Sequence, residues 1–174
     1  LNAAGVEAFN KKIIAASPTV YDMAAYPKTL GGKTVATYVN THTDLSDELY
    51  REGKLVSDNY KNILRSQTNA AAIPAEVTVR YGVTVRRANL RNLPTGEGLF
   101  FYAGDRNFDA LQETALDPGE AVAILHTSTN GYFYYVQAYN YRGWLSKFDV
   151  AETDRSIWLR YAEPKNFLTV VAKD

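Results

Sequence analysis

The spacing of the apolar residues changes near residue 76, and this change narrows the folds that the chain can adopt. Before it, apolar residues recur about every three to four positions, as on one face of a helix. After it, apolar and polar residues alternate as in a strand with one buried face, a pattern clearest at Val77, Val79, Val83 and Val85. Short alternating runs continue to about residue 151, so this half is predicted to form a small, strongly bent β-barrel.

Turn signals mark the ends of these alternating runs. Asp117-Pro118-Gly119 favours a tight turn, and Asn130-Gly131 is a strong hairpin signal. They bound predicted strands at residues 121–126 and 132–139. Before them, residues 92–106 form a long polar and aromatic loop, and loops of this length inside a compact domain often carry function.

The first part of the chain is predicted to be mainly helical. Residues 3–16 fit an amphipathic helix that presents one apolar stripe, which we expect to be a face of the core. The stripe consists of Val6, Phe9, Ile13 and Ile14. Residues 34–39 have the composition of a strand instead.

Two more helices are expected before residue 75. Asp44 is a candidate N-cap for a helix through Leu45 and Leu49, and Ser57 is a candidate N-cap for the next one. The buried side of the second helix should be formed by Tyr60, Ile63 and Leu64. Residues 70–74 then form a connector.

Together these patterns predict the α+β class. A mainly helical N-terminal segment, residues 1–75, packs on a small SH3-like β-barrel of residues 76–151. Trp144 and Trp158 are expected to be largely buried core residues. Residues 152–174 are expected to be a linker and the first strand of a truncated following domain.

Two stretches carry the prediction for this tail. Apolar residues alternate across residues 155–161, and residues 167–172 read Phe-Leu-Thr-Val-Val-Ala, the composition of a strand. Either this last strand pairs back onto the barrel, or it opens a further domain. The chain begins at Leu1 rather than at a methionine, which we interpret as a mature or trimmed sequence.

Composition excludes several functional classes for these 174 residues. The 19 Lys and Arg residues balance 19 Asp and Glu residues, so long-range attraction to nucleic acid is not expected. The chain contains no cysteine, which excludes a cysteine nucleophile, and no apolar run reaches the roughly 18 residues of a membrane span. His42 and His126 make a poor metal site, and His126 ends an apolar run as a structural residue would. No catalytic residue, metal or cofactor is therefore predicted.

Tyrosine dominates the aromatic residues, with 13 Tyr beside 7 Phe and 2 Trp. Its amphipathic ring suits both half-buried sheet faces and surfaces that bind polar ligands. Both interpretations stay open: a sheet with one wet face, or a binding surface for sugars or short peptides. The side chains that could form such a surface are Tyr132, Tyr134, Tyr139, Tyr141 and Trp144.

Four short blocks of residues follow one another along the chain in a distinctive order. They are Arg-Ala-Asn-Leu-Arg at 87–91 with Pro-Thr at 94–95, Phe-Asp at 108–109 with Gln-Glu-Thr-Ala-Leu at 112–116, Pro-Gly-Glu at 118–120 with Ile-Leu-His-Thr-Ser at 124–128, and Asn-Tyr-Arg-Gly-Trp at 140–144. In this order they resemble the first bacterial SH3 domain, the SH3b1 type, of NlpC/P60 cell-wall peptidases. Residues 49–57 resemble the helical stabilising region of the same family.

This resemblance implies a function for the chain. NlpC/P60 peptidases of this kind are γ-D-glutamyl-L-diamino acid endopeptidases, cysteine hydrolases of peptidoglycan stem peptides. Their active-site residues lie in a C-terminal catalytic domain, and this chain has no cysteine. We therefore expect the non-catalytic N-terminal part of such an enzyme, which shapes the substrate groove and restricts specificity together with a downstream catalytic domain. The alternative is a stand-alone cell-wall-binding SH3b module without catalysis.

The resemblance also implies a site and a location. Family members can recognise the free amino terminus of an L-Ala-γ-D-Glu stem peptide, with an acid and a tyrosine from the SH3b1 domain. By residue type and loop position, the candidates here are Asp109, Glu113, Tyr102 and Tyr141. It stays open that residues 112–114 form only a structural turn. The protein is expected to be exported, in the periplasm or cell envelope, with cytoplasmic recycling of murein peptides as the other possibility.

Overall fold

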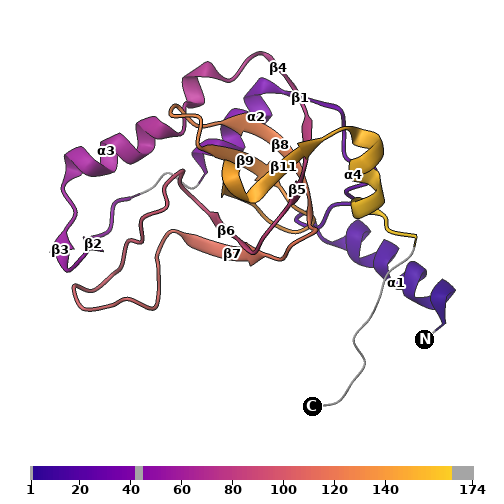
Figure 1. The fold of residues 1–174 in the computed structure, drawn as a ribbon, viewed down its shortest axis with the longest axis horizontal. Coiled ribbons are helices and arrows are strands. Elements are labelled where there is room, and N and C mark those ends of the chain that lie inside the picture. The colour runs from indigo at the N-terminus through magenta and orange to yellow at the C-terminus, as the bar shows by residue number, and fades with distance from the viewer. Residues whose placement is uncertain (1, 42–44, 166–174) are drawn as a thin grey trace.

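The computed structural model of the protein describes residues 2–41 and 45–165. The helices are α1 (Ala3–Ala16), α2 (Gly32–Asn40), α3 (Asp58–Gln67), η1 (Ala70–Ala72), η2 (Lys147–Asp149) and α4 (Arg155–Ala162). The strands are β1 (Thr29–Gly31), β2 (Tyr50–Arg51), β3 (Lys54–Leu55), β4 (Glu76–Thr78), β5 (Arg80–Thr84), β6 (Ala88–Arg91), β7 (Gln112–Leu116), β8 (Ala121–Thr127), β9 (Phe133–Gln137), β10 (Arg142–Ser146) and β11 (Val150–Thr153). This mixture of helices with an SH3-like sheet confirms the predicted α+β class (Figure 1).

A seven-stranded antiparallel sheet forms the centre of the fold, in the order β11-β5-β8-β9-β10-β6-β7. The hairpin between β8 and β9 turns at Asn130-Gly131, where Gly131 has a φ of 73° that suits glycine. That predicted turn is confirmed. Strand β4 is not part of this sheet and instead pairs with β1 from the N-terminal segment.

The two faces of this sheet pack against different neighbours. Along β9, Tyr134 and Val136 point into one hydrophobic cluster, while Tyr135 between them points into another. Strand β8 alternates in the same way, so residues 121–125 are buried throughout. A strand covered on both faces reads as a continuous apolar run, which explains the Ala-Val-Ala-Ile-Leu sequence of β8.

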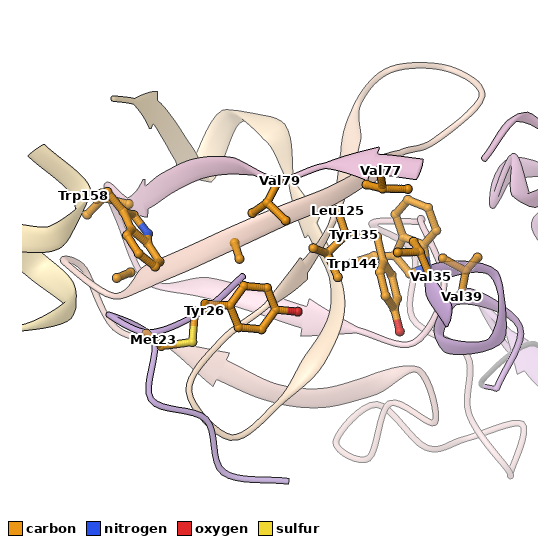
Figure 2. Packing of buried hydrophobic residues seen from close by; sticks show 13 residues of the cluster. Met23, Tyr26, Val35, Val39, Val77, Val79, Leu125, Tyr135, Trp144 and Trp158 are labelled. Atoms are coloured by element: carbon orange, nitrogen blue, oxygen red, sulfur yellow. The ribbon is translucent and has the colours of Figure 1, made fainter. Parts of the chain in front are cut away.

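The cluster that contains Tyr135 joins the N-terminal segment to the sheet, and we name it the shared core. Figure 2 shows Val35 and Val39 of α2 beside the rings of Tyr135 and Trp144. Trp144 and Trp158 are fully buried, as predicted, and the Trp158 indole also donates a hydrogen bond to a backbone carbonyl of β8. The helical segment and the barrel therefore share apolar contacts.

Another cluster anchors the long loop between β6 and β7, and we name it the loop-base cluster. Its members are Leu45, Leu49, Val56, Leu64, Leu93, Leu99 and Leu111. Helix α3 begins where predicted, because the Ser57 side chain accepts a hydrogen bond from the Tyr60 N–H at 3.3 Å. Ile63, expected to be buried, is instead 47% exposed. Residues i and i+4 share a helix face, so Tyr60 and Leu64 face the cluster and Ile63 does not.

Three predicted elements differ in the structure. Residues 34–39, predicted as a strand, lie in helix α2, because Val35 and Val39 are spaced one helical turn apart and both enter the shared core. Residues 155–161, read as alternating, form helix α4 with Trp158 on its buried side. Residues 45–49 are not helical, and their proposed cap, Asp44, lies outside the described residues.

Helix α1 has the predicted bounds, but its apolar stripe is not a core face. Its four apolar side chains, Val6, Phe9, Ile13 and Ile14, are all exposed, with Phe9 at 57%. Figure 1 shows the helix at the periphery of the molecule. The prediction that this stripe forms a face of the core was therefore wrong. Residues 167–172, predicted as a strand, lie outside the described residues.

Candidate functional site

A hollow of about 560 Å³ lies between the N-terminal segment and the β9–β10 hairpin, and we name it the hairpin pocket. It is lined by Thr19, Val20, Tyr38, Thr41, Glu113, Tyr135, Gln137, Asn140, Tyr141 and Arg142. These residues come from the stretch before β1, from α2, from the start of β7 and from the hairpin. The pocket thus needs both the helical segment and the barrel.

Hydrogen bonds to two backbone carbonyls help to hold the N-terminal segment against the hairpin. The Tyr21 N–H donates to the Tyr139 carbonyl at 2.7 Å. The Tyr135 hydroxyl donates to the Tyr38 carbonyl, near the end of α2, at 2.8 Å. Both bonds join residues far apart in sequence, so they fix the two walls of the pocket relative to each other.

The turn after β9 carries Tyr141 and Arg142 into the pocket wall. Gln137 is 1% exposed, and its Nε2 atom donates to the carbonyls of Ala138 at 2.7 Å and of Tyr141 at 3.1 Å. The Ala138 N–H also donates to the Tyr141 carbonyl at 2.8 Å. A buried amide therefore satisfies the backbone of this turn, which explains a glutamine among aromatic residues.

Charges of both signs line the pocket. Glu113 supplies a carboxylate, and Arg142 supplies a guanidinium whose Cζ atom lies 3.7 Å from the centre of the Tyr38 ring. Burial raises the pKa of the Tyr135 hydroxyl, the nearby Arg142 charge opposes this rise, and Glu113 adds to it. The Tyr135 hydroxyl therefore stays protonated at neutral pH and can keep its hydrogen bond.

The four residues predicted for substrate binding do not lie together. Glu113 and Tyr141 both line the hairpin pocket. Asp109 and Tyr102 do not, since Tyr102 lies 74% exposed on the loop between β6 and β7 and Asp109 lies at the base of that loop. The structure therefore separates the candidates into one pair that shares a cavity and two that do not.

Asp109 is engaged entirely by protein groups. Its Oδ2 atom pairs with Nη1 of Arg91 at 2.7 Å, and the Arg91 side chain is only 6% exposed. Its Oδ1 atom accepts hydrogen bonds from the N–H groups of Leu99 at 3.1 Å and Leu111 at 3.0 Å. These contacts tie the two ends of the long loop together and give Asp109 a structural role.

A second hollow of about 460 Å³ lies between the β2–β3 hairpin and the long loop. On its wall, Glu97 accepts hydrogen bonds from the Tyr60 hydroxyl and from Arg51, the latter at 2.7 Å. The Tyr60 hydrogen bond and, to a smaller extent, Arg51 lower the pKa of the Glu97 carboxyl, although burial opposes this. The Glu97 carboxylate is therefore already hydrogen-bonded within the protein.

His126 has the structural role expected from the sequence. Its Nε2 atom donates to the Asn69 carbonyl at 3.0 Å, and its ring meets Trp144 edge-on. His42 lies outside the described residues. Within residues 2–41 and 45–165, no three potential His, Cys, Asp or Glu ligands gather as a metal site would require. In the same part of the chain, none of the helices is both long and apolar enough to cross a bilayer.

The aromatic surface is smaller than the sequence suggested. Tyr132, Tyr139 and Tyr141 are exposed. Tyr134 and Trp144, predicted as possible surface residues of the same set, are buried, because the strands that carry them are covered on both faces. They pack in the two cores and are not available to a ligand.

Comparison with known proteins defines the class of the domain. Residues 99–146 match the family model of the SH3 domain of the SH3b1 type, which confirms the resemblance seen in the ordered sequence blocks. Among solved structures, the chain is similar to an NlpC/P60 endopeptidase from Photobacterium damselae subsp. piscicida, with a TM-score of 0.68 and 19% sequence identity. That similarity covers 90% of this chain and 38% of the endopeptidase chain, and at this identity it shows a shared fold. No curated protein matches the sequence.

Sequence reasoning missed Tyr38 and Arg142 as pocket residues. Tyr38 lies in the segment predicted as a strand, so its place one turn beyond Val35 on a helix was not foreseen. Arg142 lies inside the Asn-Tyr-Arg-Gly-Trp block, next to the candidate Tyr141. A turn that carries one candidate residue also positions its neighbours, and this signal could have identified Arg142.

Proposed function

We propose that this chain is the non-catalytic N-terminal part of a bacterial cell-wall cysteine endopeptidase, and that the hairpin pocket receives the free amino terminus of an L-Ala-γ-D-Glu stem peptide. The observation that carries the proposal is that Glu113 and Tyr141, both within the part of the chain that matches an SH3b1-type domain, line one pocket. The fold shared with an NlpC/P60 endopeptidase supports the choice of enzyme family.

The chemistry of the pocket suits an ammonium group. Glu113 offers a carboxylate that can accept charge-assisted hydrogen bonds, and these are about twice as strong as neutral ones. The ring of Tyr141 offers a π face that attracts cations. Acetylation of the peptide amine removes the positive charge, so this pocket would discriminate between a free and a blocked amino terminus.

Such a pocket would restrict which peptides are cut. A stem peptide anchored at its amino terminus would extend toward a groove that a downstream catalytic domain completes, with its scissile bond at a fixed distance from the anchor. Only stems with a free L-alanine would then be placed correctly. This role places the protein in the periplasm or cell envelope, with recycling of murein peptides in the cytoplasm as the alternative.

Isothermal titration of the chain with the tripeptide L-Ala-γ-D-Glu-L-Lys tests the proposal. The free tripeptide should bind, and its N-acetylated form should bind at least about tenfold more weakly, because a charge-assisted hydrogen bond is lost. Glu113→Gln should remove this difference. Asp117→Asn is the matched control, since Asp117 lies in an exposed ion pair with Arg87 and does not line the pocket. Equal affinity for the free and acetylated peptides would overturn the proposal.

One observation favours a stand-alone cell-wall-binding module as the second candidate. Tyr132 and Phe148 are exposed side by side, with ring centres 6.0 Å apart, and Tyr139 is exposed as well. Exposed aromatic rings are suited to stacking on sugars or peptides. Co-sedimentation with purified peptidoglycan separates the two functions. Retention on the polymer that Tyr132→Ala abolishes, without discrimination between the two tripeptides, would favour the binding module.

A further inference from the structure

Arg142 is a partly buried cation that residues 2–41 and 45–165 orient without a carboxylate partner. It begins β10, where it pairs with Gln137 across the ladder, and it lines the hairpin pocket. Its Nη2 atom donates to the Tyr21 hydroxyl at 2.9 Å, and its Cζ atom lies 3.7 Å from the centre of the Tyr38 ring. Two tyrosines therefore fix the position of the guanidinium.

Five other arginines are satisfied differently, whereas Arg155, like Arg142, donates to a neutral oxygen and lies over a tyrosine ring. Arginines paired with a carboxylate are Arg51, Arg80, Arg86, Arg87 and Arg91. For Arg142, no carboxylate in residues 2–41 or 45–165 lies within ion-pair distance. Its partners are the face of one ring and a neutral hydroxyl, and neither of them carries a negative charge.

A guanidinium in this setting is preorganised to bind an anion. Stacking on a ring leaves the N–H groups in the plane of the guanidinium able to donate, and those that Tyr21 does not use can bind a carboxylate. Because side-chain positions are already fixed, less conformational entropy is lost when the anion binds. Glu113 in the same pocket disfavours a ligand that carries only negative charge and favours one that carries both signs.

We infer that Arg142 binds a carboxylate of the ligand, so that the hairpin pocket recognises a zwitterion through Glu113 and Arg142. The inference rests on the proposed function and extends it. In an L-Ala-γ-D-Glu stem peptide, the carboxylate nearest to the amino terminus is the α-carboxylate of D-glutamate. Arg142 is thus the residue that distinguishes stems with this carboxylate free from stems in which it is amidated.

Isothermal titration with two tripeptides tests this specificity: L-Ala-γ-D-Glu-L-Lys and the same peptide with the α-carboxylate of D-glutamate amidated. The wild-type chain should bind the acid form at least about tenfold more tightly. Arg142→Gln should bind both forms equally while still preferring a free over an acetylated amino terminus. Arg87→Gln, which removes an exposed arginine outside the pocket, should keep both preferences.

Each possible outcome either supports or overturns the inference. Equal binding of the acid and amidated peptides by the wild type overturns it, as does an acid preference that Arg142→Gln retains. If the preference for the free amino terminus persists in either case, the proposed function stands without a role for Arg142. If both preferences are absent, the two proposals fail together. The wild-type comparison needs no variant, so it decides the inference even if Arg142→Gln does not fold.

Discussion

Asp109 and Glu113 lie four residues apart and are alike in sequence, since both are acids beside the long loop, but they lie in different surroundings. Asp109 sits over the loop-base cluster, where Arg91 and two backbone N–H groups engage both of its oxygens. Glu113 sits at the start of β7 and lines a pocket beside the shared core, together with Arg142. One carboxylate holds the fold, and the other faces a cavity.

What separates the two acids is the origin of their neighbours. The partners of Asp109 come from the strand before the loop and from the loop itself, so its role is set inside the barrel. The neighbours of Glu113 in the pocket include Tyr38, from a helix far earlier in the chain. Asp109 closes its own loop and has a structural role, whereas Glu113 lines a pocket between distant segments, where a ligand can enter.

The largest predicted loss of stability follows from removing Asp109, the carboxylate that holds the loop. Asp109→Ala should lower the free energy of unfolding by about 3 kcal/mol, because it leaves the buried Arg91 without a counter-charge and two backbone N–H groups without acceptors. Urea denaturation followed by circular dichroism measures the loss. Glu113→Gln in the same assay should cost less than Asp109→Ala, because Gln keeps the size and hydrogen-bonding capacity of the side chain at a half-buried position.

A matched control separates burial from the mere presence of an ion pair. Asp117 pairs with Arg87 at 2.6 Å, but both side chains are about 70% exposed. Asp117→Ala should therefore cost less than about 1 kcal/mol. If Asp109→Ala and Asp117→Ala destabilise the protein equally, the contrast between an anchoring and a ligand-facing carboxylate loses its basis.

Local sequence patterns predicted much of the barrel, because several of its strands, such as β6 with β7 and β8 with β9, pair with the next strand along the chain. The hairpin turn at Asn130-Gly131 and the burial of Trp144 follow from period and residue type, whereas the burial of Trp158 follows from residue type alone. The same reasoning failed for residues 34–39, which have the composition of a strand. There, burial of Val35 and Val39 against the sheet selects the helix, and that partner is distant in sequence.

The candidate site shows the same limit. Glu113 and Tyr141 were named from residue type and a family resemblance, and the structure places both on one cavity. Asp109 has the same residue type, but its Arg91 partner lies 18 positions earlier and could not be read from spacing. Tyr38 and Arg142 meet only because the N-terminal segment folds onto the hairpin.

A smaller loss of stability is expected from a substitution that moves the wall of the hairpin pocket. A Cβ atom added at Gly32 would lie 1.8 Å from the Pro74 carbonyl oxygen, a backbone atom that cannot turn aside. Gly32→Ala should therefore cost about 1–3 kcal/mol and displace α2, which carries Tyr38 of the pocket wall and is capped by Thr41. Tripeptide binding should weaken more than the stability loss alone explains, while the Asp109 contacts at the loop base stay intact.

The neighbouring glycine is the control for this variant. A Cβ at Gly31 would meet only the Thr34 hydroxyl, at 3.9 Å, so Gly31→Ala should cost less than about 1 kcal/mol. The division of the chain at residue 75 stays a prediction, and this pair of variants tests it. Two separate unfolding transitions in Gly32→Ala would support independent units. A single transition would show that the helical segment and the barrel unfold together.

The smallest effect concerns His126, which lies between the two regions, with its ring beside Trp144 of the shared core and its Nε2 atom on Asn69 just after α3. Burial lowers the pKa of His126, although hydrogen bonds to the Asn69 and Thr68 backbone oppose this. The unfolded chain then binds the proton more readily than the folded one. The stability that this group contributes is therefore complete above the unfolded pKa of about 6.5 and is lost as the pH falls below it toward the folded value.

Replacing the imidazole by a neutral amide isolates this contribution. The free energy of unfolding of the parent should fall more steeply between about pH 7.5 and pH 5 than that of His126→Gln, because the variant has no proton to bind at this position. Burial raises the pKa of Glu120 and has the opposite sign in the lower part of this range, but it is present in both proteins and cancels in the difference. Parallel pH profiles for the two proteins would contradict this prediction. They would mean that the stability of the contact between the barrel and the end of α3 does not depend on a neutral histidine.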